Sequence, residues 1–276
     1  MSARLRGVAR ETVEIVAAGS YRAPGGHTVT IAPAVAAARA GTRMFGPDAV
    51  RTPAIALRAT AFEVTGESSL EAARRLVSRS SDPVAVLNFA SARNPGGGFL
   101  NGAQAQEEAL CRASALYACV REAPEFYEHH RAHRDPFYTD RVIHTPGVPV
   151  FRDDRGNLLD APYQVGFLTA AAPNAGVVRQ RAPQRVPEVP RALAVRAERV
   201  LETAVACGYR RLVLGAWGCG VFMNDPATVA GSFHGLLVRG RFEGHFDEVV
   251  LGVLDRTAGA TTRGAFARAF ADVRVA

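Results

Sequence analysis

Residues 84–108 read VAVLNFASARNPGGGFLNGAQAQEE. The first seven of these residues form a nearly continuous apolar run, which is typical of a strand buried on both faces of a sheet. Three consecutive glycines follow at positions 96–98, and they leave the backbone almost free of steric limits. Such a loop is able to turn its amide N–H groups towards an anion. A buried strand, a glycine loop and a helix from about residue 105 therefore predict an α/β fold with a ligand site at the end of this strand.

The rest of the chain continues the alternation of strands and helices. Strands are expected at 27–32, 62–65, 84–90, 164–169, 212–215 and 249–254, and helices at 2–18, 69–79, 105–120, 188–206, 226–238 and 262–273. Residues 33–50 predict a short helix and a loop, and the four prolines within 136–163 predict a hairpin-like insertion. We expect a three-layer α/β/α sandwich with a mixed sheet, in which residues 1–50 are an N-terminal extension packed on a main domain of residues 51–276.

The composition bounds the class of protein. The chain has 276 residues and 48% hydrophobic content, which is enough for a sizeable core. No apolar run approaches the roughly 20 residues of a membrane span, and the N-terminus lacks a signal-peptide core. The four cysteines, Cys111, Cys119, Cys207 and Cys219, have no Cys-x-x-Cys spacing, so we expect buried, reduced thiols. These features predict a soluble, cytoplasmic protein.

The chain contains no lysine, so arginine is its only permanently charged basic residue. The net charge is +7, and all 33 basic residues are arginines. Codon bias in a GC-rich genome is the simplest reason for the lack of lysine. A basic surface would also attract a polyanionic substrate and raise its encounter rate. The arginines are spread along the chain without a concentrated basic run, so we expect no direct DNA binding.

A pair of acids lies shortly after the glycine loop. Gln106-Glu107-Glu108 begins the predicted helix, and paired carboxylates suit acid/base chemistry at a sugar carbon. Either feature alone is weak, because a glycine run is often only a turn and acids at a helix start often only compensate the helix macrodipole. Together, at this spacing, they predict a site for a phosphorylated sugar.

A second glycine loop, GAWGCGVF at 215–222, follows the predicted strand 212–215. Asp225 and Pro226 then supply an N-cap and a first-turn proline for the next helix. A strand, a glycine loop and a capped helix form a recurring anion-binding device. The alternative is a connection that needs glycine only for its backbone angles. Because both glycine loops follow buried strands, we expect them to meet at one edge of the sheet.

The glycine run followed by QEE resembles the signature of poly(ADP-ribose) glycohydrolases. The flanking text, NFASAR at 88–93 and ALCRASALY at 109–117, is similar to the bacterial-type branch, and the likeness is again specific at 212–226. The resemblance implies a macrodomain-like sandwich. It also implies hydrolysis of the ribose–ribose O-glycosidic bonds of poly(ADP-ribose) with release of ADP-ribose. The expected partners are therefore poly(ADP-ribose) and ADP-ribose, and neither a metal nor a cofactor is required.

The resemblance also implies roles for single residues. Glu108 corresponds to the catalytic acid/base, and Glu107 to a residue that orients the sugar through its hydroxyls. Cys219 would be a small spacer and not a nucleophile. Ser91 stands where related eukaryotic enzymes carry an asparagine, so we expect Asn94 to bind the distal ribose. The residues expected to bind substrate are Asn94, Gly96, Gly97, Gly98, Gln106, Gly218, Cys219, Gly220, Val221 and Phe222.

Two other functions are compatible with parts of the sequence. A non-catalytic ADP-ribose-binding macrodomain reader would need the loops but not the paired acids. A nucleotide-handling transferase or a nucleic-acid binder would use the arginines but would have no need of QEE. His129 and His133 lie one helical turn apart without a third ligand, so we expect a surface cluster and no metal site. Bacterial-type relatives are understood to cut at the polymer terminus because an extra segment caps it, and residues 21–26 are the candidate for such a cap.

Overall fold

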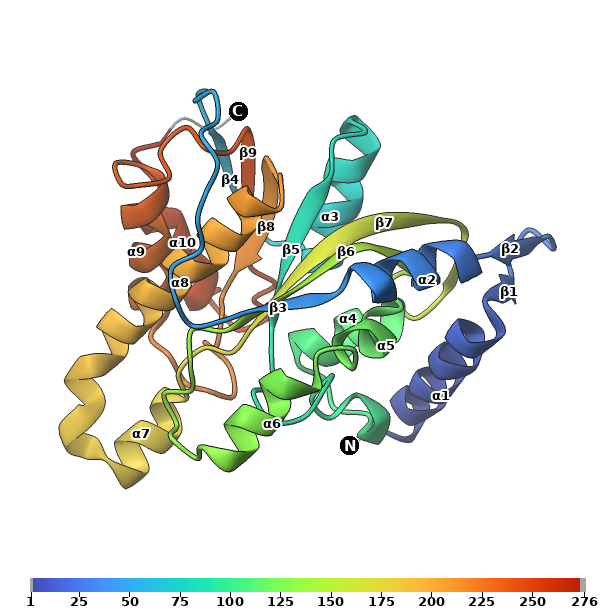
Figure 1. Ribbon diagram of the computed structural model, residues 1–276, viewed down its shortest axis with the longest axis horizontal. Coiled ribbons are helices and arrows are strands. Elements are labelled where there is room, and N and C mark those ends of the chain that lie inside the picture. Colours follow the sequence, from blue (N-terminus) through green and yellow to red (C-terminus); the bar gives the residue numbers. More distant parts are fainter. Residues whose placement is uncertain (1, 274–276) are drawn as a thin grey trace.

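The computed structural model describes residues 2–273, and a mixed seven-stranded sheet lies at its centre (Figure 1). Its strands, in spatial order, are β3 (Arg43–Phe45), β6 (Val142–Arg152), β7 (Leu158–Ala170), β5 (Val84–Phe89), β8 (Arg211–Gly215), β9 (Glu248–Gly252) and β4 (Ala61–Thr65). The strands from β7 to β4 run parallel, whereas β6 is antiparallel to both of its neighbours. A separate small hairpin joins β1 (Ser20–Arg22) to β2 (Thr28–Thr30).

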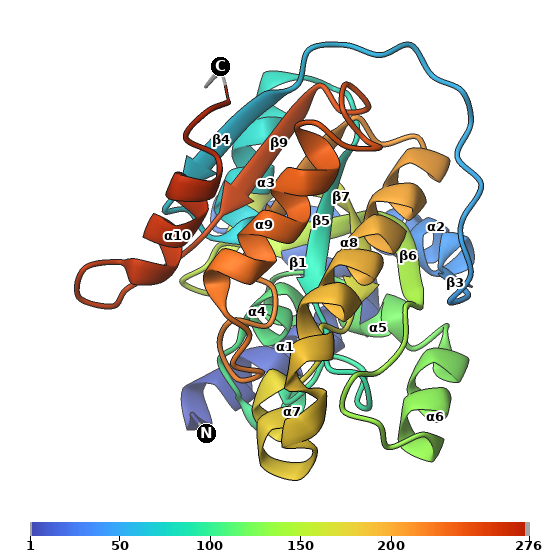
Figure 2. The same cartoon turned by 90° about the vertical axis from the view of Figure 1, so that its left-hand side faces the viewer.

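Helices cover both faces of the sheet (Figures 1 and 2). One face carries α1 (Ala3–Ala18), α2 (Ala32–Gly41), α3 (Ser69–Arg79), α4 (Gln106–Ala113), α5 (Leu116–Val120) and α6 (Pro124–Ala132). The other carries α7 (Ala175–Arg181), α8 (Val189–Ala206), α9 (Pro226–Leu237) and α10 (Thr261–Ala269). Short 3₁₀ turns, η1 (Phe99–Asn101) and η2 (Pro183–Glu188), complete the elements. The predicted three-layer sandwich is confirmed, and the division of the chain at residue 50 stays a prediction.

Two hydrophobic cores lie on opposite faces of the sheet. Alternate residues of β5 belong to different cores, with Val84 and Val86 in one and Ala85 and Leu87 in the other. This alternation follows from the period of two along a strand. It explains why residues 84–90 read as an apolar run, since both faces of β5 are covered by helices.

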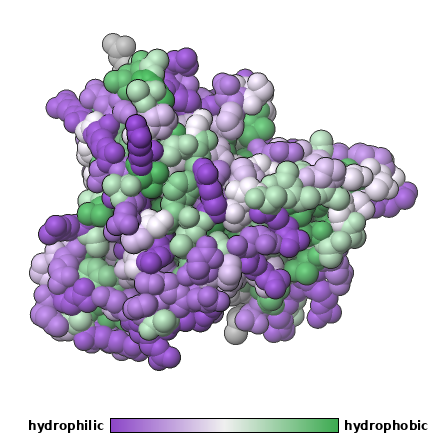
Figure 3. Space-filling model, viewed as in Figure 1, coloured by the Kyte–Doolittle hydropathy of each residue, from purple (hydrophilic) through white to green (hydrophobic). Residues whose placement is uncertain are grey.

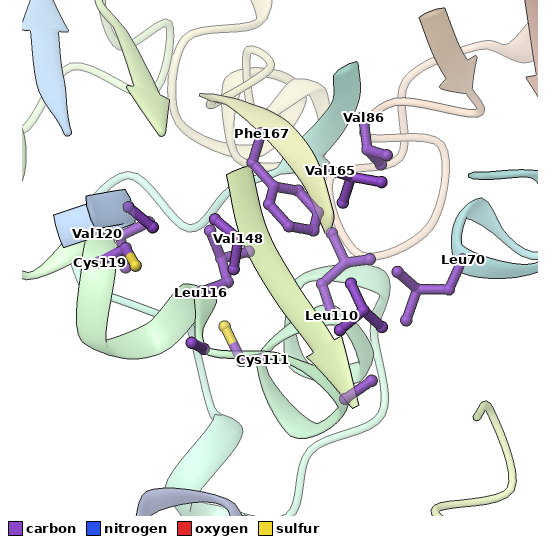
Figure 4. Close-up of a cluster of buried hydrophobic side chains, with 14 of the residues drawn as sticks. Leu70, Val86, Leu110, Cys111, Leu116, Cys119, Val120, Val148, Val165 and Phe167 are labelled. Carbon is purple, nitrogen blue, oxygen red and sulfur yellow. The ribbon is translucent and has the colours of Figure 1, made fainter. Parts of the chain in front are cut away.

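Helix α4 is anchored in the first of these cores. Figure 4 shows Leu110 and Cys111 of α4 in one cluster with Val148 of β6 and with Val165 and Phe167 of β7. All five side chains are at most 2% exposed. Burial of each such side chain contributes roughly 1.5–3 kcal/mol, so the position of α4 over the sheet is well determined.

The predicted helix 105–120 is wrong in one respect, because it is interrupted at Ser114. Ser114 has extended backbone angles and forms an antiparallel bridge with Val150 of β6. Its hydroxyl donates to the carbonyl of Leu110 at 2.7 Å, and the N–H of Ala115 donates to the carbonyl of Pro149 at 3.1 Å. Pairing with the sheet therefore competes with helix continuation, and it divides the segment into α4 and α5.

The expected insertion at 136–163 is also corrected. Its hairpin provides β6 and the first half of β7, which continues without a break through the strand predicted at 164–169. Pro146 lies in β6 at a register shift between Thr145 and Val148, next to Gly147 with φ 55°. Proline is tolerated at such irregularities, so prolines here do not exclude a strand of the main sheet. Strand β3, within the segment expected to be helix and loop, was missed.

The turn at 21–26 lies at the wrong end of the sheet for the expected cap. The Tyr21 hydroxyl donates to the carbonyl of Leu159 at 2.7 Å, and the N–H of Gly25 donates to the Asp160 carboxylate at 2.6 Å. Leu159 and Ala170, at opposite ends of β7, are separated by about 35 Å at the rise of an extended strand. Residues 21–26 therefore do not reach the edge at which the glycine loops emerge.

All four cysteines are free. Cys111 and Cys119 are buried as expected, whereas Cys207 and Cys219 are only partly buried, because they lie at the end of α8 and in the second glycine loop. No helix within residues 2–273 has both the length and the apolar character needed to span a membrane.

Gly166 of β7 provides a test of the packing between the sheet and Tyr209. A Cβ added at Gly166 would overlap the Tyr209 side chain, which is 5% exposed and whose hydroxyl bonds to His144 at 2.9 Å. We predict that Gly166→Ala lowers the free energy of unfolding by about 1–3 kcal/mol in urea denaturation. The control, Gly231→Ala in α9, adds a Cβ to open space and should raise that free energy by about 0.5–1 kcal/mol. Equal stabilities of the two variants would contradict this packing.

Candidate active site

The two glycine loops emerge side by side at one edge of the sheet. β5 and β8 are parallel neighbours, with Val84 opposite Arg211, so the segments after their carboxyl ends leave the same edge. The end of β7 lies on the other side of β5, with Phe89 opposite Ala170. The predicted convergence of the loops is therefore confirmed, and the site is assembled around residues 90–105, 171–174 and 216–225.

Gln106 fixes the start of α4 to the end of β5. Its side-chain amide donates to the carbonyl of Leu87 at 2.8 Å and to the Ser69 hydroxyl at 3.0 Å. Its side-chain oxygen accepts from the N–H of Phe89 at 2.9 Å. Both polar groups of Gln106 are thus engaged within the protein. These contacts favour a role in positioning the two glutamates, and contact of Gln106 with substrate stays a prediction.

Glu107 is only 2% exposed and points back towards β5. Its carboxylate accepts from the N–H of Ser91 at 2.7 Å and from the side-chain amide of Asn88 at 3.3 Å. Asn88 is held in turn by Thr169 at 3.1 Å. Burial raises the pKa of Glu107 to about 8, although both hydrogen bonds favour the charged form. A substantial fraction of Glu107 is therefore protonated near neutral pH.

Glu108 faces the glycine loop. Its Oε1 accepts from the N–H of Gly98 at 2.8 Å. Its Oε2 is buried and has no hydrogen-bond partner among residues 2–273. The residue as a whole is 8% exposed. One oxygen is therefore fixed by the loop, and the other is left without a hydrogen-bond partner in the described part of the chain.

The glycines of the first loop allow it to wrap closely around these acids. Gly96 and Gly97 have φ of 68° and 58°, which other residues rarely adopt. A Cβ on Gly97 would lie 2.5 Å from Oε1 of Glu108 and 3.1 Å from Oε2 of Glu107. A Cβ on Gly98 would lie 2.8 Å from that of Ala103. The groups packed against this loop are therefore the carboxyl groups of the two glutamates. They leave no room for a side chain at Gly97, and the sequence reasoning did not foresee this need for glycine.

The second loop presents free amides. The N–H groups of Gly218, Gly220, Val221 and Phe222 donate to no atom in the described part of the chain, whereas that of Cys219 donates to Ala216 at 3.1 Å. Val221 is 79% exposed, and a Cβ on Gly220 would meet open space. This loop therefore has unused donors at the surface, as an anion site requires.

Gly218 and Cys219 serve the shape of this second loop. Gly218 has φ 71°, and an added Cβ there would overlap Asn224 and lie 2.7 Å from the Cβ of Ala172. Burial raises the pKa of Cys219 to about 12, so its thiol stays protonated at neutral pH. A protonated thiol is a poor nucleophile, which agrees with the expected spacer role of Cys219.

Tyr138 connects the two loops, and the sequence reasoning missed it. Its ring lies 5.9 Å from the ring of Phe222 in the second loop, and the Arg93 guanidinium of the first loop lies 5.9 Å from its centroid. Phe137 is buried, whereas Tyr138 is only partly buried. Tyr138 has φ 57°, and no sequence pattern marks a tyrosine for that conformation.

Asn94, at the rim of the first loop, is exposed.

The histidines lie outside the group of residues formed by the two glycine loops and the start of α4. His129 and His133 stack with ring centroids 4.1 Å apart, and His133 bonds to the carbonyl of His129 at 2.9 Å. Residues 2–273 hold no group of three or more histidine, cysteine or acidic side chains placed to bind a metal ion. The His144 ring bonds to the Tyr209 hydroxyl at 2.9 Å.

Comparison with protein families gives one match. The family described as "Microbial-type PARG, catalytic domain", where PARG is poly(ADP-ribose) glycohydrolase, matches residues 9–153. A search among curated proteins gives no match.

Solved structures are similar over nearly the whole chain. Poly(ADP-ribose) glycohydrolase from Thermomonospora curvata is 51% identical, with a TM-score of 0.93 over 98% of this chain and 100% of that one. The same enzyme bound to the inhibitor ADP-HPD is 50% identical, with a TM-score of 0.90 over 97% and 99%. Poly(ADP-ribose) glycohydrolase from Deinococcus radiodurans in complex with ADP-ribose is 46% identical, with a TM-score of 0.79 over 86% and 97%.

The buried Glu107 predicts a pH dependence of stability. Its pKa rises from an ordinary value of 4.5 to about 8 in the folded protein. Between these values the folded state binds more protons than the unfolded state, so the free energy of unfolding falls as pH rises. We predict that Glu107→Gln removes most of this fall, which is on the order of a few kcal/mol. Urea denaturation from pH 4.5 to 9 measures it, with Glu108→Gln as control, and an unchanged slope in Glu107→Gln would refute the assignment.

Proposed function

Because the chain belongs to the microbial-type poly(ADP-ribose) glycohydrolase family, we propose that it hydrolyses the ribose–ribose bonds of poly(ADP-ribose) and releases ADP-ribose. The observation that carries this proposal is Glu108. Its carboxyl group is fixed to the glycine loop by one oxygen and leaves the other oxygen without a partner among residues 2–273. A non-catalytic ADP-ribose reader would have no use for an acid held in this way.

The loops would hold the terminal ADP-ribose unit from two sides. The free N–H groups of Gly218, Gly220 and Val221 support binding of the diphosphate, since backbone donors and a nearby helix start favour anions. Gly96, Gly97 and Gly98 would contact the diphosphate and the distal ribose from the first loop. Phe222 would pack against the ribose next to the diphosphate, and Asn94 would reach the distal ribose.

Cleavage would then proceed by acid/base chemistry at the anomeric carbon of the distal ribose. Glu108 would donate its proton to the departing 2′-oxygen of the preceding unit as the glycosidic bond breaks. The oxocarbenium-like sugar cation would be stabilised by the charge of the nearby diphosphate. The Glu108 carboxylate would then remove a proton from a water molecule that attacks this carbon, which restores the acid. Glu107 would bond to the ribose hydroxyls and orient the sugar.

Arginines near the loops would assist the approach of a polyanion. Arg179 of α7 donates to the carbonyl of Met223 at 2.5 Å, and Arg131 of α6 donates to the carbonyl of Arg93 at 2.8 Å. On the face shown in Figure 3, hydrophilic side chains cover the region of α6 and α7. With a net charge of +7, the protein would attract poly(ADP-ribose) over a distance set by the ionic strength.

We infer the cellular compartment from the composition and from the absence of disulfide bonds among the four cysteines. Four free cysteines support a reducing compartment, so we place the protein in the cytoplasm. The arginines do not form one basic run, so we expect no direct DNA binding.

We further propose cleavage from the polymer terminus. The N-terminal helix would provide the closed end, but through its first turn and not through residues 21–26. The N–H of Ser2 donates to the carbonyl of Gly102 at 3.2 Å, and Arg6 lies against Gly102. Helix α1 thus closes one side of the first glycine loop, which supports a site that admits a chain end and excludes a continuing chain.

The first test of this function concerns the acid. We predict that Glu108→Gln keeps ADP-ribose affinity nearly unchanged and lowers turnover of poly(ADP-ribose) by at least the ~10²–10⁴-fold typical of a lost general acid. Glu107→Ala should weaken binding and turnover together, because it removes the orientation of the sugar. Calorimetry and product release measure the two effects. Wild-type turnover in folded Glu108→Gln would exclude Glu108 as the acid/base.

The second loop is tested by Gly220. A Cβ added there has no protein atom within 4 Å, so Gly220→Val should leave the free energy of unfolding nearly unchanged. It should weaken ADP-ribose binding about tenfold or more, because the side chain would block the neighbouring amides from the diphosphate. Calorimetry measures the affinity, with Gly231→Ala as a control outside the loop. Unchanged affinity in Gly220→Val would remove this loop from the binding site.

The cleavage mode is read from products over time. If only a chain terminus enters the site, free ADP-ribose is the dominant product of labelled poly(ADP-ribose) from the earliest times. Chromatography of samples taken during the first few per cent of reaction distinguishes the modes. Abundant short oligomers before ADP-ribose would demonstrate internal cleavage and would contradict a closed end.

A further inference from the structure

A group of arginines surrounds a cavity of about 50 Å³ between α1, α4 and the turn that joins β6 to β7. Four arginines line it, namely Arg4 of α1, Arg112 of α4, and Arg152 and Arg155 at the β6–β7 turn. Helices α1 and α4 pack against each other beside this turn (Figure 1). The volume corresponds to about four water-sized positions. It suits a small tetrahedral oxyanion and is too small for a nucleoside.

The arginines outnumber the acids that face this cavity. Asp153 and Asp154 also line it, but the Asp153 carboxylate accepts from the N–H groups of Arg155 and Asn157 at 2.9 and 2.8 Å. The Asp154 carboxylate accepts from the Ser68 hydroxyl at 2.6 Å. The lining therefore contains four arginines and two aspartates whose carboxylates are already hydrogen-bonded elsewhere, which is an excess of positive charge.

Among residues 2–273, only one of the four arginines has a carboxylate partner. Arg152 pairs with Glu11 at 2.8 Å. Arg4 and Arg155 are exposed, and neither forms a salt bridge among the described residues. A single contact joins these two, in which the Arg4 guanidinium donates to the carbonyl of Arg155 at 3.5 Å. Both side chains are therefore available to an anion.

Arg112 differs from the buried arginines of this protein in having no carboxylate partner among the described residues. Arg152, Arg196, Arg199 and Arg211 are buried, and each pairs with a carboxylate. Arg112 is half-buried, donates to the carbonyl of Ala103 at 2.5 Å, and has no carboxylate partner within residues 2–273. Burial lowers the pKa of Arg112, which reflects the cost of its charge in this place. A bound anion would offset that cost.

We propose that this cavity is a binding site for a phosphate group, separate from the candidate active site. Guanidinium groups match the oxygens of phosphate in paired hydrogen bonds, and Arg4, Arg112 and Arg155 approach the cavity from three different segments. The phosphate group comes either from free inorganic phosphate or from a polymer chain that extends beyond the active site.

Occupation of the cavity would fasten α1 to the catalytic helix. The Thr12 hydroxyl of α1 donates to the carbonyl of Arg112 at 2.7 Å and accepts from the Arg152 guanidinium at 3.3 Å. An anion among the arginines adds a further link at the same junction. An anion that binds the folded protein and not the unfolded chain would also raise the stability of the folded state.

The binding test uses inorganic phosphate and the full-length protein with ADP-ribose present in excess, so that the candidate active site is occupied. Calorimetry and thermal unfolding are recorded at constant ionic strength, with chloride as the balancing anion. We expect saturable binding and a rise in Tm for the wild type. The double variant Arg4→Gln/Arg155→Gln should bind phosphate about tenfold or more weakly. The control Arg10→Gln removes an exposed charge of α1 outside the lining and should behave as the wild type.

Two results would overturn the site, namely no saturable effect in the wild type, or an equal effect in the double variant. The KM for long poly(ADP-ribose) distinguishes the two sources of the phosphate group. This part of the experiment rests on the proposed function. With phosphate binding established, a raised KM in the double variant supports a site for polymer phosphate, and an unchanged KM supports one for free phosphate. Saturable phosphate binding in a protein that cleaves no polymer would refute the proposed function and leave this site supported.

Discussion

The hydrogen bond from the N–H of Gly98 to the carboxyl group of Glu108 links the glycine loop to the start of α4, and the geometry of the candidate site depends on it. The companion bond from the N–H of Ser91 fixes Glu107 to the same loop. Both bonds are favoured by glycine at position 97, because a Cβ there would overlap Oε1 of Glu108 at 2.5 Å and lie 3.1 Å from Oε2 of Glu107. Gln106 then ties the start of the helix to β5. Loop, acids and strand therefore act as one unit, in which displacement of any part moves Glu108.

Burial of this unit has an energetic consequence. Glu107 is enclosed beneath the loop, and its pKa of about 8 means that the charged form is disfavoured near neutral pH. The fold tolerates this cost because α4 is anchored by Leu110 and Cys111 in a well-packed core. Sites that need unfavourable protonation states commonly sacrifice stability in this way. A protonated Glu107 also avoids like-charge repulsion with Glu108.

Local signals predicted much of the fold. The N-cap expected at Asp225 is present, since it depends on contacts within one helical turn. The meeting of the glycine loops followed from the order of buried strands. Features that depend on distant contacts were not predictable. Ser114 leaves the helix to pair with Val150, and a local pattern contains no information about that partner. The location of residues 21–26, the role of the glycines around the acids and the place of Tyr138 between the loops were missed for the same reason.

The most direct test of the account is a crystal structure of Glu108→Gln with a short ADP-ribose oligomer. The account predicts that the diphosphate of the terminal unit lies on the amides of residues 218–222, with the anomeric carbon of its distal ribose next to residue 108. The glycosidic oxygen should lie within hydrogen-bonding distance of the side-chain atom that replaces Oε2. A terminal unit bound elsewhere, or one whose glycosidic oxygen faces away from residue 108, would contradict the assignment of this loop and helix as the catalytic unit.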